Sequence, residues 1–171
     1  MRRLWEYGGI AASVVLIAFG IGSIVVGANG RGDVRDELAR EKIVGTPDMK
    51  PIANKLVDTG SEAREFARGM RRHTLEATGG KTYAEMPRFA GKNGVPTNDE
   101  KQAAVDSKSG KPVDNPARQI WVTETALSTA LNTSYFAENV ADFAIVMGVA
   151  LLLTGIGFLI VTLRLLRTRA A

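Results

Sequence analysis

The stretch Phe143–Leu163, FAIVMGVALLLTGIGFLIVTL, contains 21 residues and no charged side chain. A second stretch without charge, GGIAASVVLIAFGIGSIVVG, contains the 20 residues from Gly8 to Gly27. A helix rises about 1.5 Å per residue, so each stretch reaches across a hydrocarbon core of about 30 Å. The sequence therefore predicts two transmembrane helices.

The basic residues predict how the two spans are oriented. Ala28–Asn139 is nearly neutral, with 17 Lys or Arg and 16 Asp or Glu, whereas the tips of the chain carry Arg2, Arg3, Arg164, Arg167 and Arg169. Lys and Arg tend to stay on the cytoplasmic side of a membrane. We therefore expect a protein of the cell membrane with a cytoplasmic N-terminus (1–7), a first span (8–27), an extracytoplasmic domain (28–139), a second span (140–163) and a cytoplasmic basic tail (164–171).

A cleaved signal peptide is the alternative interpretation of residues 1–28, because a basic start is followed by an apolar run and by the small residues Gly27 and Ala28. The apolar run is longer than the usual signal core of about 7–15 residues. Trp5 and Tyr7 also occupy positions typical of an interfacial anchor. We favour the membrane anchor.

The region between the spans predicts helices and loops. Residues 28–32 (ANGRG) favour a break after the first span, and a short helix containing Val34 and Leu38 should follow it and end at residues 45–48. Thr59 and Glu62 fit a capping box for a helix over residues 60–77. The expected buried stripe of that helix consists of Ala63, Phe66, Met70, His73 and Ala77.

Residues 81–115 are rich in Gly, Pro and polar residues, so we expect mostly loop, one short helix near residues 98–105 and no strand. Asn115 and Pro116 are a typical cap and first residue of a new helix. Ile120, Leu127 and Leu131, with Glu124 and Ser134 at intermediate turns, form a thin stripe along it. Whether this helix continues into the second span or bends at residues 132–134 stays open. The predicted fold class is mainly α, with two transmembrane helices flanking a helix- and loop-rich domain.

No residue pattern in the chain indicates an enzyme, a cofactor or a metal site. The chain contains no cysteine, and its one histidine, His73, is expected to be a buried, hydrogen-bonded helix residue. Residues 79–82 (GGKT) resemble the end of a phosphate-binding loop, but Leu75 replaces the required glycine and no strand precedes it. The basic charge is explained by topology, so we expect neither a nucleotide nor a nucleic acid as partner.

Two charged features of the sequence are candidates for a function, an arginine-rich helix face and the single residue Asp142. An arginine-rich face on the 60–77 helix is a candidate for an anionic partner, although Glu62, Glu65 and Glu76 favour a self-paired face; it consists of Arg64, Arg68, Arg71 and Arg72. Asp142 lies at the outer edge of the second span, where it is a candidate for a polar pathway through the membrane.

Small residues within the spans predict close helix packing, because small side chains allow two backbones to approach in lipid. The candidate packing residues are Ser13, Ala18, Gly22, Ser23, Gly27, Gly148, Gly155 and Gly157.

Three stretches, residues 44–49 (VGTPDM), 74–86 (TLEATGGKTYAEM) and 121–138 (WVTETALSTALNTSYFAE), resemble uncharacterised two-span membrane proteins of high-GC Gram-positive (actinobacterial) type. The resemblance implies the same topology and brings no activity or site residues.

We therefore expect a non-enzymatic structural or accessory membrane protein whose partners are the lipid bilayer and either itself or other membrane subunits. The alternative is a small homo-oligomeric channel or transport component.

Overall fold

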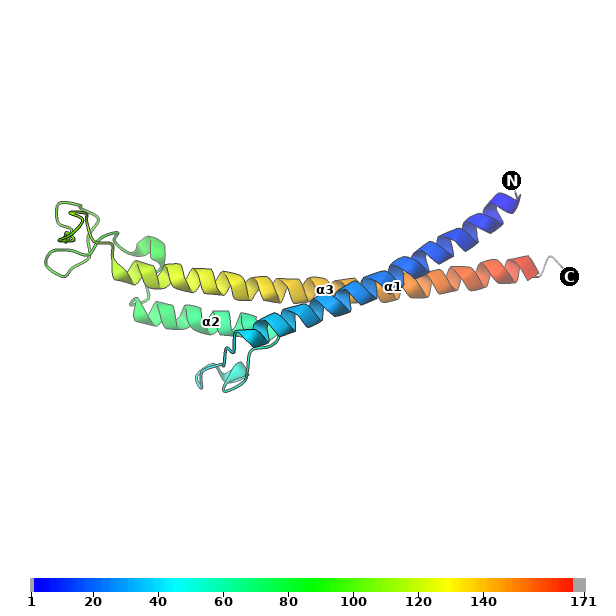
Figure 1. The fold of residues 1–171 in the computed structure, drawn as a ribbon, viewed down its shortest axis with the longest axis horizontal. Helices are drawn as coiled ribbons and strands as arrows, with labels where there is room; N and C mark the ends of the chain where they lie inside the picture. The colour runs from blue at the N-terminus through cyan, green and yellow to red at the C-terminus, as the bar shows by residue number, and fades with distance from the viewer. Residues whose placement is uncertain (1, 168–171) are drawn as a thin grey trace. The chain divides into compact units, whose positions relative to one another are not determined.

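The computed structural model describes residues 2–167, and these form three α-helices, two short 3-10 helices and no strand (Figure 1). The mainly helical prediction is confirmed. Met1 and residues 168–171 of the expected basic tail lie outside the described residues. The elements are α1 (Arg2–Arg40), η1 (Lys50–Ile52), α2 (Gly60–Ala77), η2 (Tyr83–Glu85) and α3 (Pro116–Arg167).

The chain divides into two compact units, and α3 contributes to both. Unit 1 comprises residues 1–41, 58–60 and 135–171. Unit 2 comprises residues 42–57 and 61–134. Each unit is described separately below.

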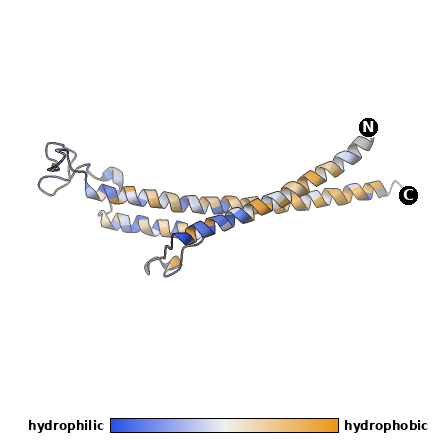
Figure 2. Ribbon diagram, viewed as in Figure 1, coloured by the Kyte–Doolittle hydropathy of each residue, from blue (hydrophilic) through white to orange (hydrophobic). Residues whose placement is uncertain are grey.

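Two helices are long and apolar enough to cross a membrane, over Tyr7–Arg40 and Pro116–Leu166. Figure 2 shows hydrophobic residues along the second half of α3 and along the part of α1 that packs against it. Only 11% of the most apolar 18-residue segment of each helix is buried. A core helix of a soluble protein would bury most of such a segment, so these exposed apolar surfaces are consistent with a membrane protein.

Unit 1 is an antiparallel pair formed by α1 and the second part of α3, joined by small residues. Three of these on α1 are seven residues apart and buried, and so are three on α3: Ser13, Gly20 and Gly27; Ala141, Gly148 and Gly155. A Cβ atom added at Gly20 would lie 2.7 Å from Leu152 N and 2.8 Å from Gly148 O. The two backbones therefore meet where these residues carry no larger side chain, and the seven-residue repeat keeps this seam on one side of each helix.

The predicted break at residues 28–32 is wrong, because α1 continues through this segment to Arg40. Gly27 packs against the backbone of Ala141, and Gly30 lies within contact distance of the same residue. Arg31 pairs with Glu138 and Asp142 on α3. This packing outweighs the weak helix propensity of the two glycines and Asn29.

Unit 2 is organised by α2 and the first part of α3, which lie side by side. The buried positions of α2 include Ala63, Ala67 and Thr74, whereas Ala77 is exposed and Phe66 is only half-buried. The predicted extent of α2 is confirmed, but its predicted stripe is displaced. The buried positions are occupied by small residues, which allow helices to approach closely.

The predicted stripe of α3 in unit 2 is wrong at two apolar positions, whereas Glu124 and Leu131 are buried. Ile120 and Leu127 are 43% and 50% exposed, whereas Trp121 and Leu131 are 3% and 5% exposed. The helix has no interruption at residues 132–134. The sequence is compatible with two helix faces one residue apart, one through Ile120 and one through Trp121. The face with the larger aromatic side chain is the one that is buried.

Residues 81–115 form a compact loop around Met86, Phe89 and Ala103, which are buried. The helix expected near residues 98–105 is absent, because Ala104 N donates to Ala90 O and Ala104 O accepts from Val113 N. These bonds use the backbone groups that a helix would need. The loop ends where predicted, because Asn115 Oδ1 accepts from Ala117 N and caps α3.

Candidate functional site

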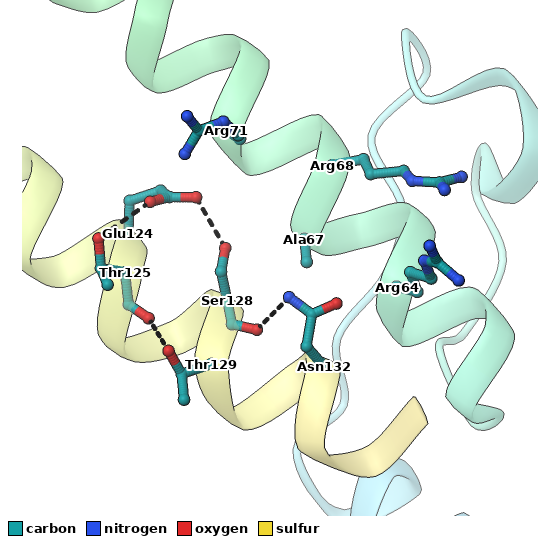
Figure 3. A pocket seen from close by; sticks show the side chains of 9 residues that line it. All are labelled: Arg64, Ala67, Arg68, Arg71, Glu124, Thr125, Ser128, Thr129 and Asn132. Atoms are coloured by element: carbon teal, nitrogen blue, oxygen red, sulfur yellow. Dashed lines mark hydrogen bonds between the residues drawn. The ribbon is translucent and has the colours of Figure 1, made fainter. Parts of the chain in front are cut away.

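A cleft of about 220 Å³ lies between α2 and α3 within unit 2 and contains most of the predicted arginine-rich face (Figure 3). One wall comes from α2 and the other from α3. The lining residues are Arg64, Ala67, Arg68, Arg71, Glu124, Thr125, Ser128, Thr129 and Asn132.

The α3 wall of this cleft is a connected set of hydrogen bonds around a buried carboxylate. Glu124 is 4% exposed, and its two carboxylate oxygens accept from Ser128 Oγ at 2.8 Å and Thr125 Oγ1 at 3.4 Å. Thr129 Oγ1 donates to Thr125 O, and Asn132 Nδ2 donates to Ser128 O. These hydroxyl groups satisfy part of the hydrogen-bonding capacity of a carboxylate that would otherwise be costly to bury.

The α2 wall is held in place by an indole ring. Trp121 Nε1 donates to Lys81 O at 2.9 Å and to Thr78 Oγ1 at 3.3 Å, which fixes the ring against the end of α2. The guanidinium carbon of Arg71 lies 5.2 Å from the centre of that ring. Figure 3 shows Arg71 beside Glu124, whereas the guanidinium groups of Arg64 and Arg68 extend away from α3.

The four predicted arginines are divided between two places. Arg72 does not line the cleft, because it pairs with Asp48 and lies 3.9 Å from Glu76. Arg68 pairs with Glu65 one turn earlier on α2. Among the ion pairs of the described residues, none involves Arg71, whose guanidinium lies over the ring of Trp121 instead.

His73 joins a second polar cluster, formed where residues 42–57 fold against α2. His73 Nε2 lies 2.6 Å from Asp48 Oδ2, and Thr46 Oγ1 donates to Asp48 Oδ1 at 2.6 Å. Hydrogen bonds from Thr46, His73 and Arg72 hold the pKa of the Asp48 carboxyl well below its usual value. The predicted hydrogen-bonded role of His73 is confirmed, but its side chain is 40% exposed rather than buried.

Nearby, Met49 fixes the same segment to α2. Met49 is 4% exposed, and its side chain fills the space that a Cβ atom at Gly69 would take.

The predicted packing residues of the spans also divide into two sets. Ser13, Gly27, Gly148 and Gly155 lie in the seam between α1 and α3. A Cβ atom at Gly148 would clash with the backbone of Gly20, and one at Gly155 would clash with the side chain of Ile17. Gly22 and Gly157 have nothing within 4 Å of an added Cβ.

An apolar groove of about 510 Å³ lies on the outer side of unit 1. Its lining includes three of the predicted packing residues; the full set is Ala18, Phe19, Gly22, Ser23, Val26 and Ala144.

Asp142 is part of an ion-paired group at the boundary of the uncharged stretches. Arg31 Nη1 lies 3.2 Å from Asp142 Oδ1, and Arg31 Nε lies 3.8 Å from Glu138 Oε1. Glu138 is buried against Gly60, where an added Cβ would lie 2.8 Å from Glu138 Oε2. One carboxylate oxygen of Asp142 is thus paired within unit 1.

Sequence reasoning missed Gly20 and Trp121, and it placed Glu124 on the stripe of α3 without a functional role. Gly20 has no small residue four positions before or after it, but small residues at a spacing of seven include Ser13, Gly20 and Gly27 together. A comparable signal exists for Glu124, since it is the only charged residue from Gln119 to Ala137.

Among residues 2–167, no group of three or more His, Cys, Asp or Glu side chains could hold a metal ion. Comparison of the chain with protein-family models, curated proteins and solved structures finds no match.

Proposed function

We propose that this chain is a non-enzymatic accessory protein of the cell membrane, anchored by the apolar parts of α1 and α3 and assembling with another transmembrane helix. The observation that carries the proposal is the open apolar groove around Gly22. The seam of unit 1 already uses Gly20, Gly27, Gly148 and Gly155. The small residues Ala18, Gly22 and Ser23 are left for a contact outside this pair.

An apolar helix is the occupant that fits this groove. The groove lies within the uncharged stretch of α1, and all six of its lining residues are uncharged. In lipid, helices associate where small residues let backbones approach, because the hydrophobic effect gives no preference between lipid and protein. A soluble ligand would gain no polar contact there beyond the hydroxyl of Ser23.

In this proposal both termini are cytoplasmic and residues 31–133 are extracytoplasmic. The basic residues at the tips of the chain support this orientation. On intact cells, an impermeant thiol reagent should label a cysteine introduced at Ser107. It should not label one introduced at Thr168. Equal labelling of the two would refute the orientation.

The assembly is tested by Gly22→Leu, with Gly157→Leu as the matched control. Both glycines are exposed helix positions in apolar surroundings, but only Gly22 lines the groove. Gly22→Leu should reduce the size of the complex purified in mild detergent, measured by light scattering, whereas Gly157→Leu should leave it unchanged. An unchanged mass and unchanged co-purifying subunits in Gly22→Leu would remove the groove from the proposal.

The alternative of a channel rests on Asp142, which pairs with Arg31 in unit 1. No observation therefore favours it over the accessory role.

A further inference from the structure

The two walls of the cleft in unit 2 offer different hydrogen-bonding groups. On the α3 wall, the hydroxyl hydrogens of Ser128 and Thr129 are donated to Glu124 and to Thr125 O. The carboxylate of Glu124 accepts only, and each of its oxygens retains a lone pair beyond the bond described above. This wall therefore favours a ligand that donates hydrogen bonds.

The opposite wall favours an anion. The guanidinium of Arg71 carries five N–H donors, lies over the fixed ring of Trp121 and takes part in none of the ion pairs found among residues 2–167. A planar guanidinium held on an aromatic face is pre-organised to bind phosphate or carboxylate through two parallel hydrogen bonds. The stems of Arg64 and Arg68 line the same cleft, but their guanidinium groups extend away from α3 and Arg68 is paired with Glu65, so Arg71 is the arginine that would bind the anion.

We propose that this cleft binds a small hydroxylated phosphate, of the chemical class of glycerol phosphate. The phosphate group would pair with Arg71, and the hydroxyl groups would donate to Glu124 and the neighbouring oxygens of α3. The inference goes beyond the accessory role, because the cleft lies in unit 2 and the proposed assembly groove lies in unit 1.

The size and charge of the cleft favour this class over larger or simpler anions. Its volume of about 220 Å³ is below the roughly 300–1,000 Å³ of sites for drug-sized ligands, so it suits a group of few atoms. Inorganic phosphate carries its hydroxyl hydrogens on the same charged group that would pair with Arg71, so it cannot separate its charge from the buried carboxylate of Glu124 as a ligand with a separate hydroxyl can. A hydroxyl donor between phosphate and carboxylate removes that conflict.

Isothermal titration calorimetry of the full chain in detergent, with glycerol 3-phosphate, inorganic phosphate and glycerol as probes, tests the proposal. Glycerol 3-phosphate should bind more tightly than either of the other two. Arg71→Gln should weaken its binding at least about tenfold, the amount expected for loss of a charge-assisted hydrogen bond. Arg72→Gln is the matched control, since Arg72 is a neighbouring arginine of α2 that does not line the cleft.

The proposal is overturned if glycerol 3-phosphate does not bind, or if Arg72→Gln weakens binding as much as Arg71→Gln does. Glu124→Gln sharpens the test, with its fold checked by circular dichroism. This change removes the repulsion of a bare anion, so the preference for glycerol 3-phosphate over inorganic phosphate should shrink by several-fold. An unchanged preference would contradict the assignment of Glu124.

The same chemistry is available free in solution or as a lipid headgroup, and nanodiscs separate the two sources. Retention of phosphatidylglycerol over phosphatidylcholine that is lost in Arg71→Gln would assign the headgroup. Binding of soluble glycerol 3-phosphate without such retention would assign the free ligand.

Discussion

Unit 1 and unit 2 are both built on a pair of helices, but different forces hold each pair together. In unit 1 the contact is made by backbone and small side chains, with Gly20 against Gly148 at its centre. In unit 2 the contact depends on the large buried ring of Trp121, whose indole N–H also donates hydrogen bonds. The first arrangement suits lipid, where close packing is the main attraction, and the second suits water, where burial of a large ring is favourable.

This difference predicts which substitutions each unit tolerates. Added volume should be harmful in unit 1, because the seam has no space for a Cβ atom. Removed volume should be harmful in unit 2, because its core is small and depends on few large side chains.

The largest effect is expected for Trp121→Ala in unit 2. The substitution removes a ring that is 3% exposed and leaves Lys81 O without its indole donor. The free energy of unfolding of this unit should fall by about 3–5 kcal/mol. Hydrogen exchange followed by mass spectrometry should then show lost protection in α2 and in residues 81–115.

Ile120→Ala is the matched control for this experiment, because Ile120 is adjacent in sequence and 43% exposed. Its effect should stay near the roughly 0.5 kcal/mol of ordinary surface changes. A larger loss for Ile120→Ala than for Trp121→Ala would restore the face predicted from sequence.

A smaller effect is expected for Gly20→Ala in unit 1. The added methyl would lie 2.7 Å from Leu152 N, so one helix must shift, at a cost of about 1–3 kcal/mol. Gly22→Ala is the control, since nothing lies within 4 Å of its Cβ position.

An engineered disulfide reports on this seam. The Cβ position at Gly9 lies 3.7 Å from Thr162 Cβ, within the roughly 3.5–4.5 Å that a disulfide spans. The pair Gly9→Cys and Thr162→Cys should therefore cross-link readily. Gly20→Ala should lower the yield and Gly22→Ala should not; equal yields would show that backbone contact at Gly20 does not hold the pair.

The same contrast explains which parts of the fold could be predicted from sequence. The two apolar helices, the extent of α2 and the cap at Asn115 follow from local composition, and the structure agrees with each. The continuation of α1 through Gly30 depends on contacts with Ala141 and Glu138, residues more than 100 positions away. Local propensity cannot report such contacts.

The candidate site shows the same limit. Sequence placed four arginines on one helix, but the folding of residues 42–57 draws Arg72 to Asp48 and away from the other three. Glu124 enters the cleft only because α2 and α3 lie side by side.

The smallest effect is expected at Asp48, which joins residues 42–57 to α2 within unit 2. The groups facing its carboxylate are Thr46, Arg72 and His73, and Glu76 shares Arg72 with it. Because these hydrogen bonds lower the pKa of Asp48 below its ordinary value of 3.8, its contribution to stability is present above about pH 4. That contribution is lost as the pH falls through the lowered pKa.

A fluorophore attached at Lys50→Cys, an exposed position, should therefore report release of residues 42–57 only in strong acid. Asp48→Asn should give a small part of the released signal already at neutral pH and remove this acid transition, while α2 and α3 keep their helicity. Asp99→Asn, in the other loop of the unit, should behave as wild type. If Asp48→Asn kept the segment fully bound at neutral pH, Met49 packed on Gly69 would be its principal attachment, and unit 2 would depend on apolar contacts more than its polar clusters indicate.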